Sequence, residues 1–142
     1  MPPLLKNTNK NTRNIMKRKT QIEYPLNPSS SVIIWNAISS TAGLERWFAD
    51  RVTKEGKTYT FRWGKTETRQ AIVVNSRPEF FIRVHWLDDE EAKSYFELKI
   101  HYNELTTDHT LEVTDFAEPG EEEDVRNLWD SQIETLKRVF GV

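Results

Sequence analysis

The chain has 142 residues, the length of one ordinary domain, and a domain of this size buries roughly two thirds of its unfolded surface without disulfides. It contains no cysteine, which excludes disulfides, thiolate zinc sites, iron–sulfur clusters and a cysteine nucleophile. The net charge is −2, but residues 1–20 carry six basic and no acidic side chains, which leaves 14 basic and all 22 acidic residues in the remainder. This acidic remainder argues against nucleic-acid binding by the folded domain, because phosphate contacts need clustered Lys and Arg.

The first residues differ in composition from the rest of the chain. Residues 1–15 are rich in Asn, Thr and Lys without periodicity, which predicts a flexible basic leader ahead of one domain over 16–142. Met16 stands directly before the first periodic segment and is a candidate start of the native chain. The leader lacks the apolar core of a signal peptide, and no apolar run reaches the ~18 residues that span a membrane. We therefore expect a cytoplasmic protein without membrane insertion.

The first half of the domain begins with a strand and two short helices. Alternating apolar and polar residues predict a half-buried strand over 17–24, which prolines end. The serines that follow are placed to cap a helix that runs to about Ser39. A second, short helix is predicted over 42–48, where the apolar residues, Trp47 and Phe48 among them, have helical spacing.

A series of strands follows, because apolar residues recur at every second position between short turns. The predicted strands cover residues 58–63, 71–75, 80–87, 95–102 and 110–117. Short turns between consecutive strands make them antiparallel neighbours. The sequence therefore predicts a sheet of one continuous antiparallel run.

The clearest element is a C-terminal helix of about 19 residues. It begins at the acidic run 121–124, where negative charge suits the helix dipole, and Gly141 follows it as a C-cap. Its apolar face is interrupted only by Gln132. Because such a helix cannot bury its apolar face alone, we predict an α+β fold in which a curved antiparallel sheet of about six or seven strands wraps around it, with two short helices after the first strand.

Four strings of residues carry a resemblance to a known family. They are residues 43–50 (GLERWFAD), 86–90 (WLDDE), 114–117 (TDFA) and 128–134 (LWDSQIE). Together with the order of elements over 17–142, they resemble the helix-grip fold of the START-like (SRPBCC) superfamily, and within it a bacterial family related to the activator-of-heat-shock-ATPase domain. The resemblance implies an apolar cavity between helix and sheet, and it implies no particular reaction.

Aromatic side chains are the first candidates for a functional site. Those expected to point inward are Tyr59, Phe61, Trp63, Phe80, Trp86, Phe96 and Trp129. They either line a ligand cavity closed by the helix or fill that space themselves, since each ring buries about 150–250 Å². Trp47 or Phe48 could have one of two roles. Either residue could gate the cavity mouth or contact a protein there, or it could pack in the core.

Two polar residues in apolar surroundings join this set. Asp115 and Gln132 either orient a ligand, form hydrogen bonds with the local backbone or cap the neighbouring helix. The candidate ligand-binding residues are therefore Trp47, Phe61, Trp63, Phe80, Trp86, Phe96, Asp115, Trp129, Gln132 and Ile133.

Metal sites and nucleophilic catalysis find little support. The three histidines show no ligand spacing, and the acidic runs 88–91 and 121–124 lack the pattern of a calcium loop, so we expect no metal and no other cofactor. There is no Gly-x-Ser-x-Gly string, and five glycines in all leave no loop that cradles a phosphate. Catalysis by a desolvated Asp or Glu stays open, since it depends on the three-dimensional environment.

The sequence thus favours a non-catalytic domain that binds a small apolar ligand between helix and sheet. One alternative is a chaperone-associated or regulatory domain that binds a protein partner. Another is an enzyme of the cyclase or hydrolase type with an acid or base in its cavity. Exposed aromatic residues at a sheet edge would favour a homodimer.

Overall fold

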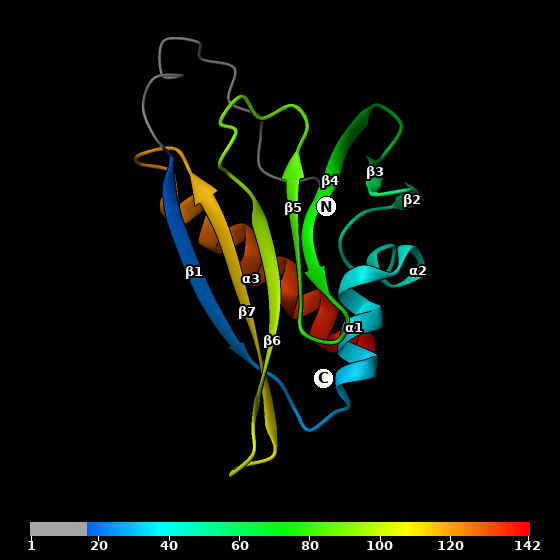
Figure 1. Ribbon diagram of the computed structural model, residues 1–142, viewed down its shortest axis with the longest axis vertical. Coiled ribbons are helices and arrows are strands. Elements are labelled where there is room, and N and C mark those ends of the chain that lie inside the picture. Colours follow the sequence, from blue (N-terminus) through cyan, green and yellow to red (C-terminus); the bar gives the residue numbers. More distant parts are fainter. Residues whose placement is uncertain (1–16) are drawn as a thin grey trace.

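The computed structural model describes residues 17–142, so the predicted leader over 1–15 and Met16 lie outside the described residues. The elements are β1 (Arg18–Pro25), α1 (Ser31–Ser39), α2 (Thr41–Leu44), β2 (Arg51–Glu55), β3 (Thr58–Trp63), β4 (Glu67–Arg77), β5 (Phe81–Trp86), β6 (Phe96–Asn103), β7 (Asp108–Ala117) and α3 (Glu122–Phe140). The strands form one antiparallel sheet in the order β1-β7-β6-β5-β4-β3-β2. In Figure 1, α3 crosses one face of the curved sheet and α1 lies beside its C-terminal end. The predicted helix-grip α+β fold is confirmed.

Helix α3 has the boundaries and the buried face that its sequence predicts. Three acidic residues lie in its first turn, and Gly141 ends it in the left-handed conformation (φ 69°) with its N–H bonded to the Lys137 carbonyl. A left-handed C-cap suits Gly because it has no Cβ to clash with the backbone. The residues that α3 buries against the sheet are Val125, Trp129, Gln132, Ile133 and Leu136.

The two short helices meet at a close approach of the backbone. Ser30 caps α1 by accepting from the Ile33 N–H at 3.2 Å, and Ser40 caps α2 by accepting from the Gly43 N–H at 2.9 Å. A Cβ at Gly43 would overlap the carbonyl oxygen of Asn36. Helix α2 is shorter than predicted, because residues 45–48 continue it as a turn.

The sheet contains one strand that the sequence does not reveal. β2 buries only Val52 and exposes its other four residues, so it lacks the alternation that identifies a strand. In each of the two edge strands, β1 and β2, one backbone group forms a hydrogen bond with a side chain from elsewhere in the chain. The Val52 N–H donates to Glu45 Oε2 at 2.9 Å in β2, and Arg126 Nη2 donates to the Gln21 carbonyl at 3.5 Å in β1. Such contacts limit pairing of an edge with another chain.

The inward direction predicted for Phe80 is wrong. Its side chain is 48% exposed, because β5 begins one residue later and Phe80 belongs to the β4–β5 turn. Glu79 adopts a positive φ of 67° there, and the Phe80 N–H donates to the Arg77 carbonyl at 2.9 Å. The Arg77 guanidinium lies 4.2 Å from the centroid of the Phe80 ring, outside the core.

Candidate ligand-binding site

Five of the rings predicted to point inward, and the ring of Trp47, converge on the ring of Phe48, while Tyr59 stacks on Phe61 at 5.5 Å. The Phe48 centroid lies between 4.9 and 6.4 Å from the rings of Trp47, Phe61, Trp63, Trp86, Phe96 and Trp129. These come from the segment after α2, from strands β3, β5 and β6, and from α3. We call these seven residues the ring cluster. The sequence identifies its members, and Phe48 occupies the space among them.

Hydrogen bonds hold the segment that carries Phe48. Trp47 Nε1 donates to the Ala37 carbonyl at 2.7 Å, and Trp63 Nε1 donates to the Phe48 carbonyl at 2.9 Å. Phe48 is 2% exposed and Trp47 is 5% exposed. A buried indole N–H needs an acceptor, and here the backbone provides it. Both residues therefore pack in the core, which is one of the two alternatives set out for them.

Asp115 extends the ring cluster toward the N-terminal half of α3. Its Oδ2 accepts from Trp129 Nε1 at 2.8 Å, and its Oδ1 accepts from the backbone N–H of Phe116 at 2.7 Å. Burial raises the pKa of Asp115 to about 6, although both hydrogen bonds and the positive charges of Lys17 and Arg69 act in the opposite direction. Asp115 thus contacts the local backbone and positions a core tryptophan at the same time.

Basic side chains near Asp115 have their own acidic partners. Arg69 is 8% exposed, donates to both oxygens of Asp88 at 2.9 and 2.7 Å, and lies 3.9 Å from the centroid of the Trp86 ring. Lys17 pairs with Asp89 at 2.7 Å. These contacts close the end of the sheet near Asp115 with paired charges. The titratable carboxyl at this end is that of Asp115, and both of its oxygens already accept hydrogen bonds from N–H groups of the protein.

The remaining candidates on α3 differ from each other. Gln132 is 3% exposed, and its Nε2 donates to no atom of residues 17–142. A buried amide without a partner is uncommon, since most buried polar groups form hydrogen bonds. Ile133 is fully buried, and it also forms part of a pocket on the side of α3 that faces β1.

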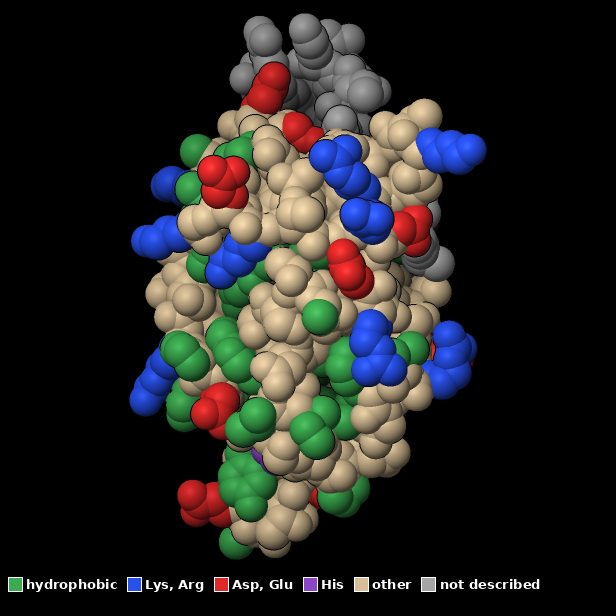
Figure 2. All heavy atoms as spheres, turned by 90° about the vertical axis from the view of Figure 1, so that its right-hand side faces the viewer, with side chains coloured by type: hydrophobic (Ala, Val, Ile, Leu, Met, Phe, Trp, Pro, Cys, Tyr) green, Lys and Arg blue, Asp and Glu red, His purple; other side chains and the backbone are tan. Residues whose placement is uncertain are grey.

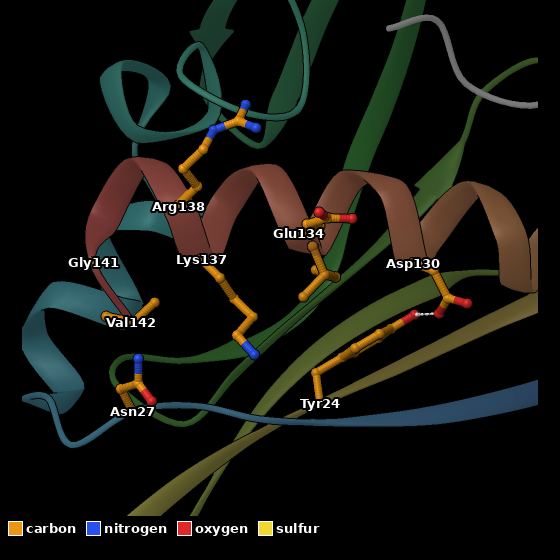
Figure 3. A pocket seen from close by; sticks show the side chains of 9 residues that line it. Tyr24, Asn27, Asp130, Glu134, Lys137, Arg138, Gly141 and Val142 are labelled. Atoms are coloured by element: carbon orange, nitrogen blue, oxygen red, sulfur yellow. Dashed lines mark hydrogen bonds between the residues drawn. The ribbon is translucent and has the colours of Figure 1, made fainter.

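This open pocket has a volume of ≈ 550 Å³ and lies between the C-terminal half of α3 and β1 (Figure 3). Tyr24 OH donates to Asp130 Oδ1 at 2.7 Å across one end of it. Burial and this hydrogen bond raise the pKa of Tyr24, so the hydroxyl keeps its proton. The lining consists of Tyr24, Asn27, Asp130, Ile133, Glu134, Lys137, Arg138, Gly141 and Val142. We call it the α3–β1 pocket.

Sequence reasoning identified only Ile133 among these lining residues. The pocket joins the end of β1 to the end of the chain, where the Asn27 N–H donates to the Val142 carbonyl at 3.1 Å. The two segments are more than a hundred residues apart in the sequence, and the periodicity of either one does not show their contact. The amphipathic pattern of α3 places Lys137 on the face opposite to the apolar one, so it gives no sign of this pocket.

Neither a metal site nor a membrane-spanning helix is found in the described part of the chain. Among residues 17–142, no group of three or more His, Asp or Glu side chains is arranged to hold a metal ion. The helices of this part of the chain are too short or too polar to cross a membrane. Of the histidines, only His109 is buried, and its ring lies 4.9 Å from that of Tyr102.

Comparison with known protein families assigns the chain to a superfamily. A family model described as a START-like superfamily domain matches residues 15–142. The chain belongs to the START-like superfamily. At the level of that superfamily, membership supports a ligand-binding domain. The START-like assignment confirms the resemblance found in the four sequence strings.

Solved structures with a similar fold are found at both high and low sequence identity. The chain is 55% identical to the protein BfR322 from Bacteroides fragilis, over 87% of this chain and 90% of that one, with a TM-score of 0.64. The Aha1 dimer from Colwellia psychrerythraea is similar in fold, with 13% identity, coverage of 87% and 96%, and a TM-score of 0.72. CalU16 from Micromonospora echinospora has 15% identity, coverage of 87% and 76%, and a TM-score of 0.68. No curated protein matches the chain.

Proposed function

We propose that this START-like domain binds a small, largely apolar molecule in the α3–β1 pocket and does not transform it. The observation that carries this proposal is the open volume of ≈ 550 Å³ at a boundary between helix and sheet. Small-molecule sites are typically clefts of about 300–1,000 Å³ with apolar walls and a few polar groups. The Tyr24 ring and the methylene stem of Lys137 provide apolar surface here, and the Tyr24 hydroxyl and Asn27 provide polar groups at the rim.

The packing of the ring cluster supports the pocket over the space directly beneath α3. Phe48 lies within 6.4 Å of six other rings, so a ligand among them would have to displace it. Its segment is held by the hydrogen bonds of Trp47 and Trp63, which oppose such a displacement. The α3–β1 pocket needs no displacement of a buried ring, and binding there costs correspondingly less.

The test is a titration of the full chain with 1-decanol, a neutral apolar probe, followed by ¹H–¹⁵N NMR. We expect saturable shifts at Asn27 and over residues 130–142, and small shifts at the indole N–H signals of Trp63 and Trp129. Asn27→Trp fills the pocket from its exposed rim and should abolish these shifts. Asn127→Trp adds the same ring at an exposed position of α3 outside the lining, and it should bind like the wild type.

Other outcomes would contradict the proposal. Saturable shifts at the tryptophan indoles without shifts at residues 130–142 would place the ligand in the ring cluster. No saturable shifts with 1-decanol or with other neutral apolar probes of similar size would remove the ligand-binding function itself. Equal binding by wild type and Asn27→Trp would show that the α3–β1 pocket is not the site.

One surface feature favours a second candidate, a domain that binds a protein partner. Val32 and Ile33 in the first turn of α1 are 52% and 46% exposed, and Phe80 of the β4–β5 turn is 48% exposed. Ser31 Oγ donates to Glu79 Oε1 at 3.1 Å, which ties these two segments together. Figure 2 shows hydrophobic side chains gathered over the lower half of the face that carries α1. Exposed apolar patches of this kind often mark interaction sites.

This candidate has its own test. A tagged full chain should recover a stoichiometric partner from a native lysate, and Ile33→Asp should lose that partner. Val74→Asp is the matched control, because Val74 is equally exposed on β4. A partner retained by Ile33→Asp, or repeated recovery of none, would count against it.

A further inference from the structure

We propose that the α3–β1 pocket selects ligands with a carboxylate at one end, and that Lys137 is the residue that recognises it. This inference rests on the proposed function and names the ligand class of the same site. The class is that of small amphipathic monocarboxylates, in which one anionic group is joined to an apolar body. The juxtaposition that carries the inference is an unpaired lysine ammonium and a tyrosine ring in one open pocket.

The first step is the position of the Lys137 side chain. In Figure 3 it leaves α3 toward β1 and ends in the space between the helix and the segment that carries Asn27. The side chain is only partly exposed, and its ammonium forms no hydrogen bond or ion pair with any residue of 17–142. A partly desolvated cation without a counter-ion gains most from an anionic ligand group, because charge-assisted hydrogen bonds are the stronger ones.

The second step accounts for the other charged side chains of the pocket. Asp130 accepts the 2.7 Å hydrogen bond from Tyr24 and lies at the opposite end of the labelled side chains from Asn27. The Glu134 carboxylate and the Arg138 guanidinium lie on the side of α3 away from β1. Lys137 is therefore the charged side chain that points into the open space next to Asn27. The Asn27 amide is placed to donate a second hydrogen bond to a carboxylate held there.

The third step is the apolar part of the ligand. Ile133 and Val142 lie behind the pocket surface at 0% and 2% exposure, so the apolar surface that a ligand can cover beside Lys137 comes first from the partly exposed ring of Tyr24. The methylene stem of Lys137 adds to this surface, since lysine buries its stem and keeps its charge at the tip. A carboxylate at Lys137 would thus place an attached apolar chain along the Tyr24 ring, and burial of that chain would supply most of the affinity.

The experiment compares decanoate with 1-decanol, which share their chain and differ in charge, at low ionic strength and neutral pH. Both are titrated into the full chain by NMR. We expect decanoate to bind at least about tenfold more tightly than 1-decanol, the ratio that one hydrogen bond to a charged group supports. Lys137→Met should lower this ratio about tenfold, and Lys137→Arg should retain most of it. Lys93→Met, an exposed lysine outside the pocket, is the matched control and should keep the wild-type ratio.

The outcomes separate this inference from the proposed function. If 1-decanol binds in the pocket and decanoate binds no better, the pocket is a ligand site but the carboxylate preference is wrong. If decanoate is preferred and Lys137→Met keeps the preference, Lys137 is not the residue that recognises it. If neither probe gives saturable shifts at residues 130–142, the proposed function fails, and the carboxylate preference fails with it.

Discussion

Asp115 and Trp129 join β7 to α3 through a 2.8 Å hydrogen bond in which the indole N–H donates to a largely buried carboxylate. The bond fixes the ring of a central core residue, because Trp129 also contacts Phe48 and Phe96. This hydrogen bond thus connects the titratable carboxyl of Asp115 to the hydrophobic core. The stability of the domain should therefore depend on pH through this pair.

The first prediction concerns that dependence. The pKa of Asp115 rises from 3.8 to about 6 on folding, so the folded state holds this proton more tightly than the unfolded state. The stabilisation that this group contributes is complete below pH 4 and is lost as the pH rises through 6. A shift of about two units corresponds to about 3 kcal/mol. The difference in free energy of unfolding between Asp115→Asn and wild type should change by up to that amount, in favour of the variant, between pH 4 and pH 7.

Urea unfolding at several pH values measures this difference. Asp124→Asn removes an exposed carboxylate from the first turn of α3 and serves as the control, with a smaller change over the same range. A constant difference between Asp115→Asn and wild type from pH 4 to pH 7 would show that the carboxyl titrates alike in both states.

The second prediction concerns Phe48. Truncation to Ala removes the ring in the middle of the ring cluster, and it should lower the free energy of unfolding by about 3–5 kcal/mol. Phe48→Leu keeps more of the volume and should cost less. Equilibrium urea unfolding gives both values. A loss below about 1 kcal/mol for Phe48→Ala would indicate that the surrounding rings face an open cavity and that Phe48 is not a core residue.

A third prediction follows from the close approach at Gly43. The added methyl of Gly43→Ala would overlap the Asn36 carbonyl, so the junction of α1 and α2 would have to shift. Overpacking of this kind costs about 1–3 kcal/mol. Ala42→Gly, at the exposed neighbouring position, is the control for changes in local backbone propensity. Thermal unfolding should show a lower Tm for Gly43→Ala than for this control; equal Tm values would refute the predicted overlap.

The fourth prediction concerns the unpartnered amide of Gln132. A buried donor without an acceptor costs about 1–3 kcal/mol, and methionine has a similar length without polar hydrogens. Gln132→Met should therefore raise the free energy of unfolding by about 1 kcal/mol. Leu136→Met, a neutral change one turn further on, controls for the flexibility of methionine. Destabilisation by Gln132→Met beyond that of the control would show that the amide has a partner in solution.

Much of this fold follows from local sequence, because helix and strand periods depend on residues that are close in the chain. The acidic first turn, the apolar face and the C-terminal glycine of α3 predict a helix of about 19 residues, and the structure has Glu122–Phe140. The same periodicity predicts which rings of β3, β5 and β6 face inward, and these rings meet in the ring cluster. Together with α3, they determine the helix-grip architecture.

Tertiary structure decided what period and spacing do not encode. Phe48 lies in the middle of the cluster although residues 45–48 form a turn and not the helix that their spacing predicts. Phe80 faces outward because a positive φ at Glu79 turns the chain just before β5. The α3–β1 pocket arises where two segments from opposite ends of the sequence pack together, and the hydrogen bond from Asn27 to Val142 joins them. Contacts between distant segments depend on the packing of the whole sheet against α3, so the candidate site could be located only in three dimensions.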